Sequence, residues 1–250
     1  MKTPRTTIVI PCYNEAARFP VDQFLAFSDG NPDIHFLLVN DGSRDDTLAL
    51  LKRVQKGREE QITVLDQPRN GGKGEAVRCG ILAALNQPGR TYVGFWDADM
   101  ATPLVAIEEL VNELIHQPQM AMVFGARVKL LGRHVERQEI RHYLGRIFAT
   151  VVSVLLRLPI YDTQCGAKIF RVSPETRVLF AGPFCSRWVF DVEILARFIK
   201  HRRYDMASVQ GAICEFPLRE WRDVAGSKVR PTDFFKAFFD VLKIYRKYQK

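Results

Sequence analysis

The sequence has few cysteines, and their spacing does not suggest that they are tied together. Its 250 residues include five cysteines, an odd number, and no two of them have C-x-x-C spacing. These two features argue against a disulfide framework and against a structural zinc site. We therefore expect a protein of a reducing, cytoplasmic compartment.

Long apolar runs are also lacking. The longest apolar tract, Ile147–Leu156, has about half of the roughly 20 residues that a membrane-spanning helix needs. The first residues contain no apolar core of the kind that signal peptides carry. We expect neither a transmembrane segment nor a signal peptide, and we find no internal repeat and no low-complexity segment.

Charge and composition fit one globular domain that binds an anionic partner. An apolar content of 47% is enough to bury a sizeable core, and the formal net charge is +8. Such a charge suits a phosphate-bearing ligand, an anionic lipid surface or a nucleic acid. Because no aromatic and basic recognition motif accompanies the charge, we do not expect a nucleic-acid partner.

Short β-branched segments alternate with segments of helical periodicity in the first hundred residues. This alternation predicts the α/β class, with a doubly wound, mostly parallel sheet that binds ligands at the carboxyl ends of its strands. The expected strands are Thr6–Pro11, His35–Val39, Ile62–Asp66 and Tyr92–Trp96, and the expected helices are Asp46–Gln55 and Gly74–Leu85.

Two carboxylates, Asp97 and Asp99, directly follow an expected strand. Their two-residue spacing puts both side chains on one side of an extended chain, where like charges repel each other. Magnesium is commonly held by one or two protein carboxylates together with substrate phosphate oxygens, so a metal-diphosphate site is chemically sensible. The alternative is an ordinary polar turn after a strand.

Asp41 also follows an expected strand, and a glycine-rich loop occurs at positions 70–74. The carboxylate of Asp41 could accept hydrogen bonds from a ribose or a base, or could cap the next helix. The loop offers backbone N–H groups and Lys73 just before a helix, which suits a phosphate or a nucleotide. It is not a P-loop, because Gly74 stands where that motif needs a hydroxyl.

Four motifs in this order resemble those of family 2 glycosyltransferases with the GT-A fold. They are Pro11-Cys12-Tyr13-Asn14-Glu15, Val39-Asn40-Asp41-Gly42-Ser43, Asn70-Gly71-Gly72-Lys73-Gly74 and Asp97-Ala98-Asp99. The resemblance implies that Asp97 and Asp99 hold the diphosphate of a nucleotide sugar through Mg²⁺ or Mn²⁺. It also implies a set of donor-binding residues, which are Pro11, Tyr13, Glu15, Asp41, Lys73 and Asp97.

The second half of the chain is similar to dolichyl-phosphate β-glucosyltransferases. The motifs that carry this similarity are the segments 161–168, Ser186-Arg187-Trp188 and Phe190-Asp191-Val192-Glu193. It implies an inverting transfer of a hexose, with glucose from a UDP-sugar as the expected case, to a polyprenyl or dolichyl phosphate. Eukaryotic members of that group carry an N-terminal membrane anchor, which we do not expect here.

Basic and apolar residues adjoin each other in two places on the acceptor side. Arg133, Arg137 and Arg141 recur every four residues, so in a helix they would line one face, and the apolar stretch 143–160 follows. The segment 233–250 repeats this mixture with helical spacing. We expect both to form amphipathic helices, either packed on the domain or peripheral on the cytoplasmic face of a membrane.

The acceptor and its activation define the remaining candidates. We assign Arg127, Arg141, Arg146, Ser227 and Lys228 to an acceptor phosphate, and Asp191 and Glu193 to catalysis, as the candidate general bases that a sugar hydroxyl acceptor would need. Both carboxylates could instead organise a loop or form a hydrogen bond with the acceptor. Two alternative functions remain: a soluble family 2 transferase acting on a glycan or a small hydroxyl acceptor, and an inactive nucleotide-sugar sensor.

Within one GT-A domain over residues 1–250, we expect four parts. Residues 1–130 would form the nucleotide-sugar half and residues 161–230 the acceptor half. Residues 131–160 would form a helical insertion, and residues 231–250 a C-terminal amphipathic helix. The sequence does not indicate an oligomeric state.

Overall fold

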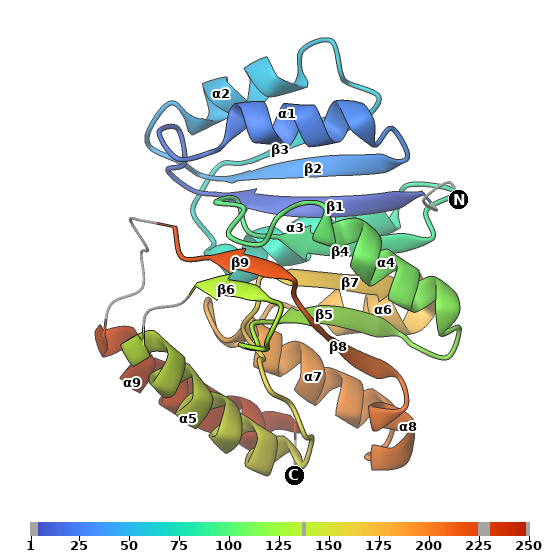
Figure 1. Cartoon of the computed structure of the whole chain (residues 1–250), viewed down its shortest axis with the longest axis vertical. Helices are drawn as coiled ribbons and strands as arrows, with labels where there is room; N and C mark the ends of the chain where they lie inside the picture. The colour runs from blue at the N-terminus through green and yellow to red at the C-terminus, as the bar shows by residue number, and fades with distance from the viewer. Residues whose placement is uncertain (1–4, 137–138, 225–230, 249–250) are drawn as a thin grey trace.

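A seven-stranded mixed sheet forms the centre of the computed structural model, which describes residues 5–136, 139–224 and 231–248 (Figure 1). The strand order is β3-β2-β1-β4-β7-β5-β8, and β7 alone in this sheet of the described chain runs against its neighbours. The strands are β1 (Thr6–Cys12), β2 (Ile34–Asp41), β3 (Ile62–Gln67), β4 (Tyr92–Trp96), β5 (Met122–Ala126), β7 (Ala167–Arg171) and β8 (Ile213–Pro217).

Both faces of the sheet are covered by helices. Because side chains alternate along a strand, Ile8 and Ile10 of β1 point into one core and Val9 into the other. Helices α1 (Val21–Gly30), α2 (Thr47–Gln55) and α4 (Ala106–His116) bury apolar residues in the core of Ile8 and Ile10. Helices α3 (Lys73–Leu85), α6 (Pro174–Phe180) and α7 (Phe190–His201) bury theirs in the core of Val9. The short helix α8 (Met206–Gln210) leads into β8.

Two long helices, α5 (Glu139–Leu156) and α9 (Pro231–Tyr248), lie side by side at one end of the molecule (Figure 1). The rings of Phe148 and Phe238 meet between them at a centroid distance of 5.7 Å. The strands β6 (His134–Glu136) and β9 (Glu220–Arg222) pair in parallel nearby as a separate two-stranded ribbon. In the part of the chain that the structure describes, no helix is long and apolar enough to span a membrane.

The predicted doubly wound, mostly parallel α/β sheet is confirmed, and the four strands expected in the first hundred residues are all present. One helical expectation is wrong. Arg133 lies in the turn before β6, and α5 begins only at Glu139, so Arg133 and Arg141 do not share a helix face. Backbone pairing with β9 keeps residues 134–136 extended. Arg137 lies outside the described residues.

Candidate active site

The carboxyl ends of three neighbouring parallel strands bring the sequence motifs together. Strands β1, β2 and β4 end at Cys12, Asp41 and Trp96, and the glycine-rich loop before α3 follows the adjacent β3. Gly80 lets α3 pack directly on this sheet, since a Cβ atom there would lie 2.4 Å from a methyl group of Val9. The close contact fixes the helix that carries Lys73 against the strand ends.

The carboxylate of Asp41 holds the glycine-rich loop. It accepts hydrogen bonds from the backbone N–H groups of Gly71 (2.7 Å) and Gly72 (2.9 Å) and from the side chain of Asn70 (3.0 Å). Burial raises the pKa of Asp41 despite these donors. The N–H groups of Gly71 and Gly72, which we expected to be suited to phosphate or nucleotide, therefore donate to a carboxylate of the protein itself. The sequence pattern does not reveal these bonds, because they join residues about 30 positions apart.

Lys73, at the start of α3, forms an ion pair with Asp97 just beyond β4. Burial by itself would lower the pKa of Lys73, but Asp97, Asp191 and Asp99 outweigh it and raise that pKa. The lysine is therefore a permanent cation among three carboxylates. This cluster joins the donor motifs of the first half to Asp191 of the second half.

Asp99 lies beside Asp97 and near Arg18, a cation that was not among the residues predicted from the sequence. Its Oδ1 accepts a hydrogen bond from the N–H of Ala101, and its Oδ2 lies 3.6 Å from the guanidinium of Arg18. Burial and the charge of Asp97 raise the pKa of Asp99. No pattern in the sequence marks Arg18, because it approaches Asp99 only when the segment after β1 folds against the segment after β4.

The oxygen atoms of Asp97 and Asp99 are suited to a hard divalent cation, but they do not form a complete ligand set. Within the described ranges, no group of three or more Asp, Glu, His or Cys side chains could hold a metal ion. Magnesium usually keeps several waters and takes one or two carboxylates plus substrate phosphates. The pair therefore fits a cation that arrives with, or is completed by, a diphosphate.

The start of β7 contacts this cluster twice, because an antiparallel strand begins where its neighbours end. Ala167 pairs with Trp96, which brings Gly166 against the carboxylate of Asp97 so closely that a Cβ atom would collide with it. Lys168 is 2% exposed, and its Nζ lies 2.8 Å from Asp191 Oδ1. Burial raises the pKa of Asp191, while Lys168 and Lys73 oppose that change.

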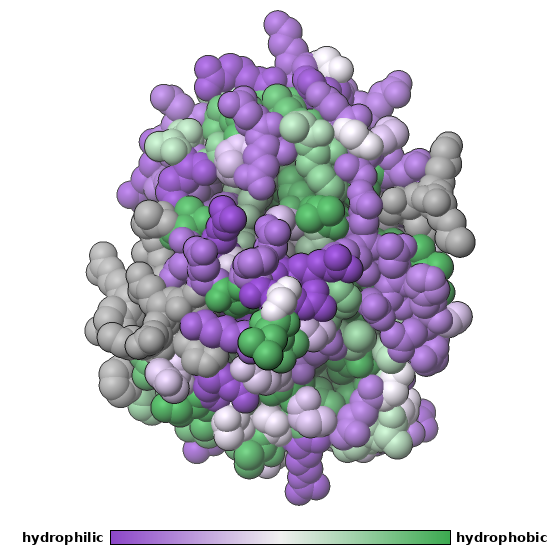
Figure 2. Space-filling model, viewed as in Figure 1, coloured by the Kyte–Doolittle hydropathy of each residue, from purple (hydrophilic) through white to green (hydrophobic). Residues whose placement is uncertain are grey.

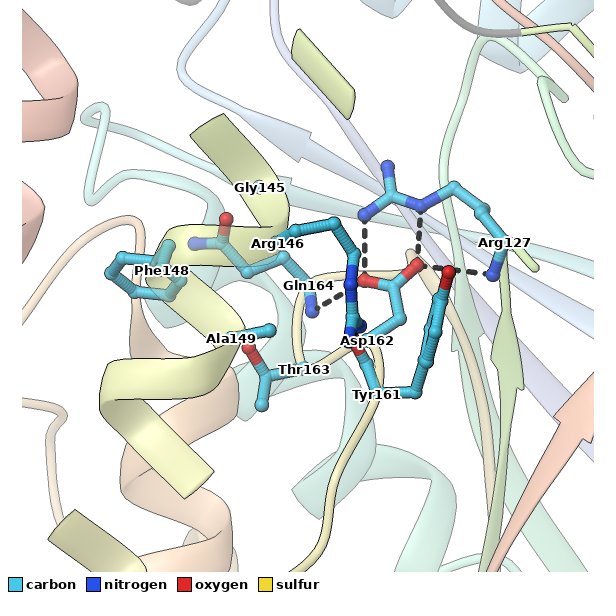
Figure 3. Close-up of a pocket in the computed structure, with 9 residues that line it drawn as sticks. All are labelled: Arg127, Gly145, Arg146, Phe148, Ala149, Tyr161, Asp162, Thr163 and Gln164. Carbon is cyan, nitrogen blue, oxygen red and sulfur yellow. Dashed lines mark hydrogen bonds and ion pairs between the residues drawn. The ribbon is translucent and has the colours of Figure 1, made fainter. Parts of the chain in front are cut away.

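Two of the predicted acceptor arginines line one small cleft between α5 and the segment 161–164 (Figure 3). Arg127 is held in a two-pronged ion pair with Asp162, at 2.6 and 2.8 Å. Arg146 donates to the carbonyl oxygen of Tyr161 (2.7 Å), and its guanidinium lies 3.5 Å from the centre of that ring. The charge of Arg127 is thus balanced by a carboxylate, whereas the guanidinium of Arg146 contacts a carbonyl oxygen and an aromatic ring.

The remaining candidates are distributed as follows. Pro11 lies at the end of β1, and the segment that carries Tyr13 and Glu15 follows it; the backbone N–H of Glu15 donates to the Thr47 hydroxyl at 2.8 Å. Arg141 belongs to α5, but its side chain is outside the described part of the structure. Ser227 and Lys228 also lie outside the described residues.

Glu193 is not brought to the cluster of Lys73 and Asp97. It is fully buried and accepts from Arg197 (2.8 Å), from the hydroxyl of Tyr248 (2.8 Å) and from the N–H of Cys185 (2.6 Å). These bonds join α7, α9 and the segment between α6 and α7. They favour the structural alternative for Glu193 over general-base catalysis.

Fold and site together define a nucleotide-sugar transferase of the GT-A type, with paired carboxylates and a lysine at the carboxyl edge of a doubly wound sheet. Residues 7–178 match the model of glycosyl transferase family 2, and the chain belongs to this family. A dolichyl-phosphate β-glucosyltransferase of Trichomonas vaginalis is 32% identical over 251 residues, covering 96% of this chain and 70% of that protein. The human dolichyl-phosphate β-glucosyltransferase is 32% identical over 245 residues, covering 92% and 71%.

Solved structures share the fold at lower sequence identity. Glucosyl-3-phosphoglycerate synthase from Mycobacterium tuberculosis, in complex with Mn²⁺, UDP and glucosyl-3-phosphoglycerate, aligns with a TM-score of 0.65 and 18% identity. The alignment covers 97% of this chain and 80% of that chain. The recognition of family 2 and of the similarity to dolichyl-phosphate β-glucosyltransferases is confirmed.

Proposed function

We propose that the protein transfers glucose from a UDP-sugar to a polyprenyl phosphate such as dolichyl phosphate, with inversion at the anomeric carbon. The observation that carries the proposal is the cluster of Lys73, Asp97 and Asp191 at the carboxyl edge of the sheet. The cluster brings Lys73, a cation that can stabilise the leaving diphosphate, together with Asp191 from the acceptor half. The names of the relatives support the sugar and the lipid.

On the donor side, the chain supplies a formed loop and fixed charges. Asp41 shapes the Asn70–Gly72 loop, against which the nucleoside would bind. Lys73 would stabilise negative charge on the departing nucleoside diphosphate, an interaction that strengthens as the bond breaks. Asp97 and Asp99 would hold Mg²⁺ or Mn²⁺, which supplies further neutralisation of the diphosphate when bound.

On the acceptor side, the nucleophile would be an oxygen of a phosphate monoester. With a second pKa near 6, such a group is largely dianionic at neutral pH and needs no general base. It needs cations that position it, and Arg146 in the cleft of Figure 3 is the described candidate. Asp191, paired with Lys168, would then shape the site and not accept a proton.

Two variants separate a phosphate acceptor from a hydroxyl acceptor. With UDP-glucose and a polyprenyl phosphate, Arg146→Gln should weaken acceptor use by about ten- to hundredfold, the value of one charge-assisted contact. Asp191→Asn should keep substantial turnover at saturating substrates, whereas loss of an essential base typically costs about 10²–10⁴-fold.

The readout is product identification by mass spectrometry together with initial rates. Because Asp191→Asn removes the charge partner of Lys168, the same variant combined with Lys168→Met is measured beside it. An inactive Asp191→Asn next to a normal Arg146→Gln would refute the lipid-phosphate acceptor and favour the soluble transferase with a hydroxyl acceptor. Release of UDP from UDP-glucose by the wild type excludes the inactive sensor.

The paired helices α5 and α9 carry the surface with which the protein would bind a membrane. Tyr143, Ile147 and Val154 of α5 are 67%, 56% and 70% exposed, and Phe239 and Leu242 of α9 are 71% and 42% exposed. Figure 2 shows apolar and polar side chains mixed over this end of the molecule. The exposed basic residues of α9 are Lys236, Lys243, Arg246 and Lys247. Apolar and basic groups on one helical surface suit an anionic lipid layer.

Flotation with vesicles of phosphatidylcholine and phosphatidylserine tests this surface. We expect binding at low salt that weakens at high salt and that is reduced in Phe239→Ser. Val178→Ser, which changes an apolar residue of α6 with 48% exposure, is the matched control and should bind normally. Equal binding of both variants, or no binding of the wild type at low salt, would contradict the proposal.

A further inference from the structure

Arg187 clamps the glycine-rich loop that Asp41 also holds. Its Nε donates to the carbonyl of Gly71 (3.0 Å), and its Nη2 donates to the carbonyl (2.7 Å) and the side-chain oxygen (3.1 Å) of Asn70. Its own carbonyl accepts from the N–H of Gly74 at 3.2 Å. Arg187, more than a hundred residues away in the sequence, thus holds the loop that precedes Lys73 and α3.

The conformation of Gly72 depends on this clamp. Gly72 has a φ of +88°, and a Cβ atom there would lie 2.9 Å from Arg187 Nε. Only glycine tolerates both the backbone angle and the close approach of the guanidinium. The loop is therefore fitted around two charged side chains, the carboxylate of Asp41 and the guanidinium of Arg187.

Helix α9 fixes the segment that carries Arg187. The hydroxyl of Ser186 donates to Asp240 Oδ2 of α9 at 2.6 Å, and it accepts from the N–H groups of Trp188 (3.2 Å) and Val189 (3.1 Å). Ser186 thereby closes the turn before α7 and ties that turn to α9. Asp240 is thus connected to the loop by the hydrogen bond to Ser186, the peptide bond from Ser186 to Arg187, and the hydrogen bonds of Arg187 to Asn70 and Gly71.

We propose that Arg187 is a positioning residue for nucleotide binding, and that α9 holds it in position through Ser186 and Asp240. The inference rests on the proposed function, because it assigns the Asn70–Gly72 loop to the nucleotide. Arg187 acts through the loop: its described bonds go to loop oxygens. The arrangement links the helix that would meet the membrane to the site that holds the donor.

The clamp can be removed without damage to the core, because the side chain of Arg187 is exposed. Arg187→Ala should raise the Kd for UDP by about tenfold, equivalent to about 1.4 kcal/mol, with an unchanged melting temperature. Arg187→Lys keeps the charge but loses the planar fork, so it should lose affinity similarly. Asp240→Ala should cause a smaller loss, and its combination with Arg187→Ala should cost no more than Arg187→Ala alone.

A matched control lies at the C-terminal end of α3, the helix that the glycine-rich loop precedes. Arg177 is also exposed and donates to the carbonyl of Leu85 and the side chain of Asn86, both at 3.0 Å, where α3 ends. Arg177→Ala should leave the Kd for UDP unchanged. Calorimetric titration with UDP and with uridine measures the affinities, and amide hydrogen exchange at Gly71 and Gly72 measures the order of the loop.

Each outcome decides the proposal. Faster exchange at Gly71 and Gly72 in Arg187→Ala, with weaker binding of both UDP and uridine, supports it. If Arg187→Ala weakens the binding of UDP but not of uridine, Arg187 is a phosphate ligand. If Arg187→Lys binds UDP with normal affinity, Arg187 supplies only a positive charge. Either result overturns the positioning role. Unchanged exchange also overturns it, whether or not UDP binds. If the wild type does not bind UDP, the proposed donor is wrong, and the exchange result alone decides the clamp.

Discussion

Replacing Gly166 by alanine tests whether the start of β7 positions Asp97, the carboxylate that we propose holds the metal and the diphosphate. The backbone of Gly166 does not lie in the left-handed region, so alanine is allowed there by its own geometry. The added methyl group would collide with the carboxylate of Asp97. Either the side chain of Asp97 turns away from Lys73, or the pairing of Ala167 with Trp96 loosens.

The expected magnitude follows from the size of this displacement. The collision is too deep to be relieved by tenths of an ångström, and a misplacement of about 1 Å at a reacting centre can cost about 10²-fold in rate. We therefore expect Gly166→Ala to lower kcat/KM by at least about 10²-fold. Because the methyl group meets the partly exposed carboxylate of Asp97 and not packed apolar core, the melting temperature should fall by only a few degrees.

Transfer from UDP-glucose to a polyprenyl phosphate, UDP titration and thermal unfolding together check this prediction. Gly30→Ala at the end of α1 is the control, since a Cβ atom at Gly30 would have no atom within 4 Å. Near-normal transfer by Gly166→Ala, at wild-type affinity for UDP, would refute the argument that β7 sets the position of Asp97.

Three further predictions concern other parts of the molecule. Glu193→Gln breaks a buried ion pair with Arg197 and should cost about 3–5 kcal/mol of unfolding free energy in urea; an inactive variant of full stability would instead make Glu193 catalytic. Burial lowers the pKa of His35 to about 4, so on acidification the unfolded chain takes up a proton before the folded chain does. The free energy of unfolding should therefore fall as the pH drops from 6.5 toward 4, by about 2 kcal/mol at pH 5. His35→Gln should lack this part of the pH dependence. Asp99→Asn or excess EDTA should lower transfer by at least about 10²-fold, and full activity in EDTA would exclude a required metal.

The donor half of the fold could be predicted from the sequence because its signals are local. Each of the first four strands is a short, largely apolar run with polar residues at or just beyond its end, and β4 has the predicted bounds Tyr92–Trp96. Parallel strands put such ends at one edge, so the placement of Asp41 and Asp97 at the same edge of the sheet follows from the pattern.

The antiparallel strand and its contacts could not be predicted in this way. Strand β7 is five residues long and contains Lys168, which a sequence pattern assigns to the surface but the structure buries against Asp191. The contacts of Arg18 with Asp99 and of Arg187 with the glycine-rich loop depend on segments that meet only in the folded chain. The buried contacts of Glu193 depend on a distant segment in the same way, since the hydroxyl of Tyr248, 55 positions away, donates to it.

The reversed direction of β7 has a consequence for how the two halves of this enzyme can vary. Backbone pairing between β4 and β7 fixes the register of Asp97, on one half, against Lys168, on the other. A slip of one residue would turn Lys168 to the opposite face of the sheet and away from Asp191. Loops that lie outside this ladder can lengthen or shorten while the ladder stays intact. The segment before Gly166 is tied to the ladder, since Lys168 Nζ donates to the carbonyl oxygens of Thr163 (3.0 Å) and Cys165 (2.6 Å). The position of Asp97 relative to Lys168 is therefore inherited with the sheet itself.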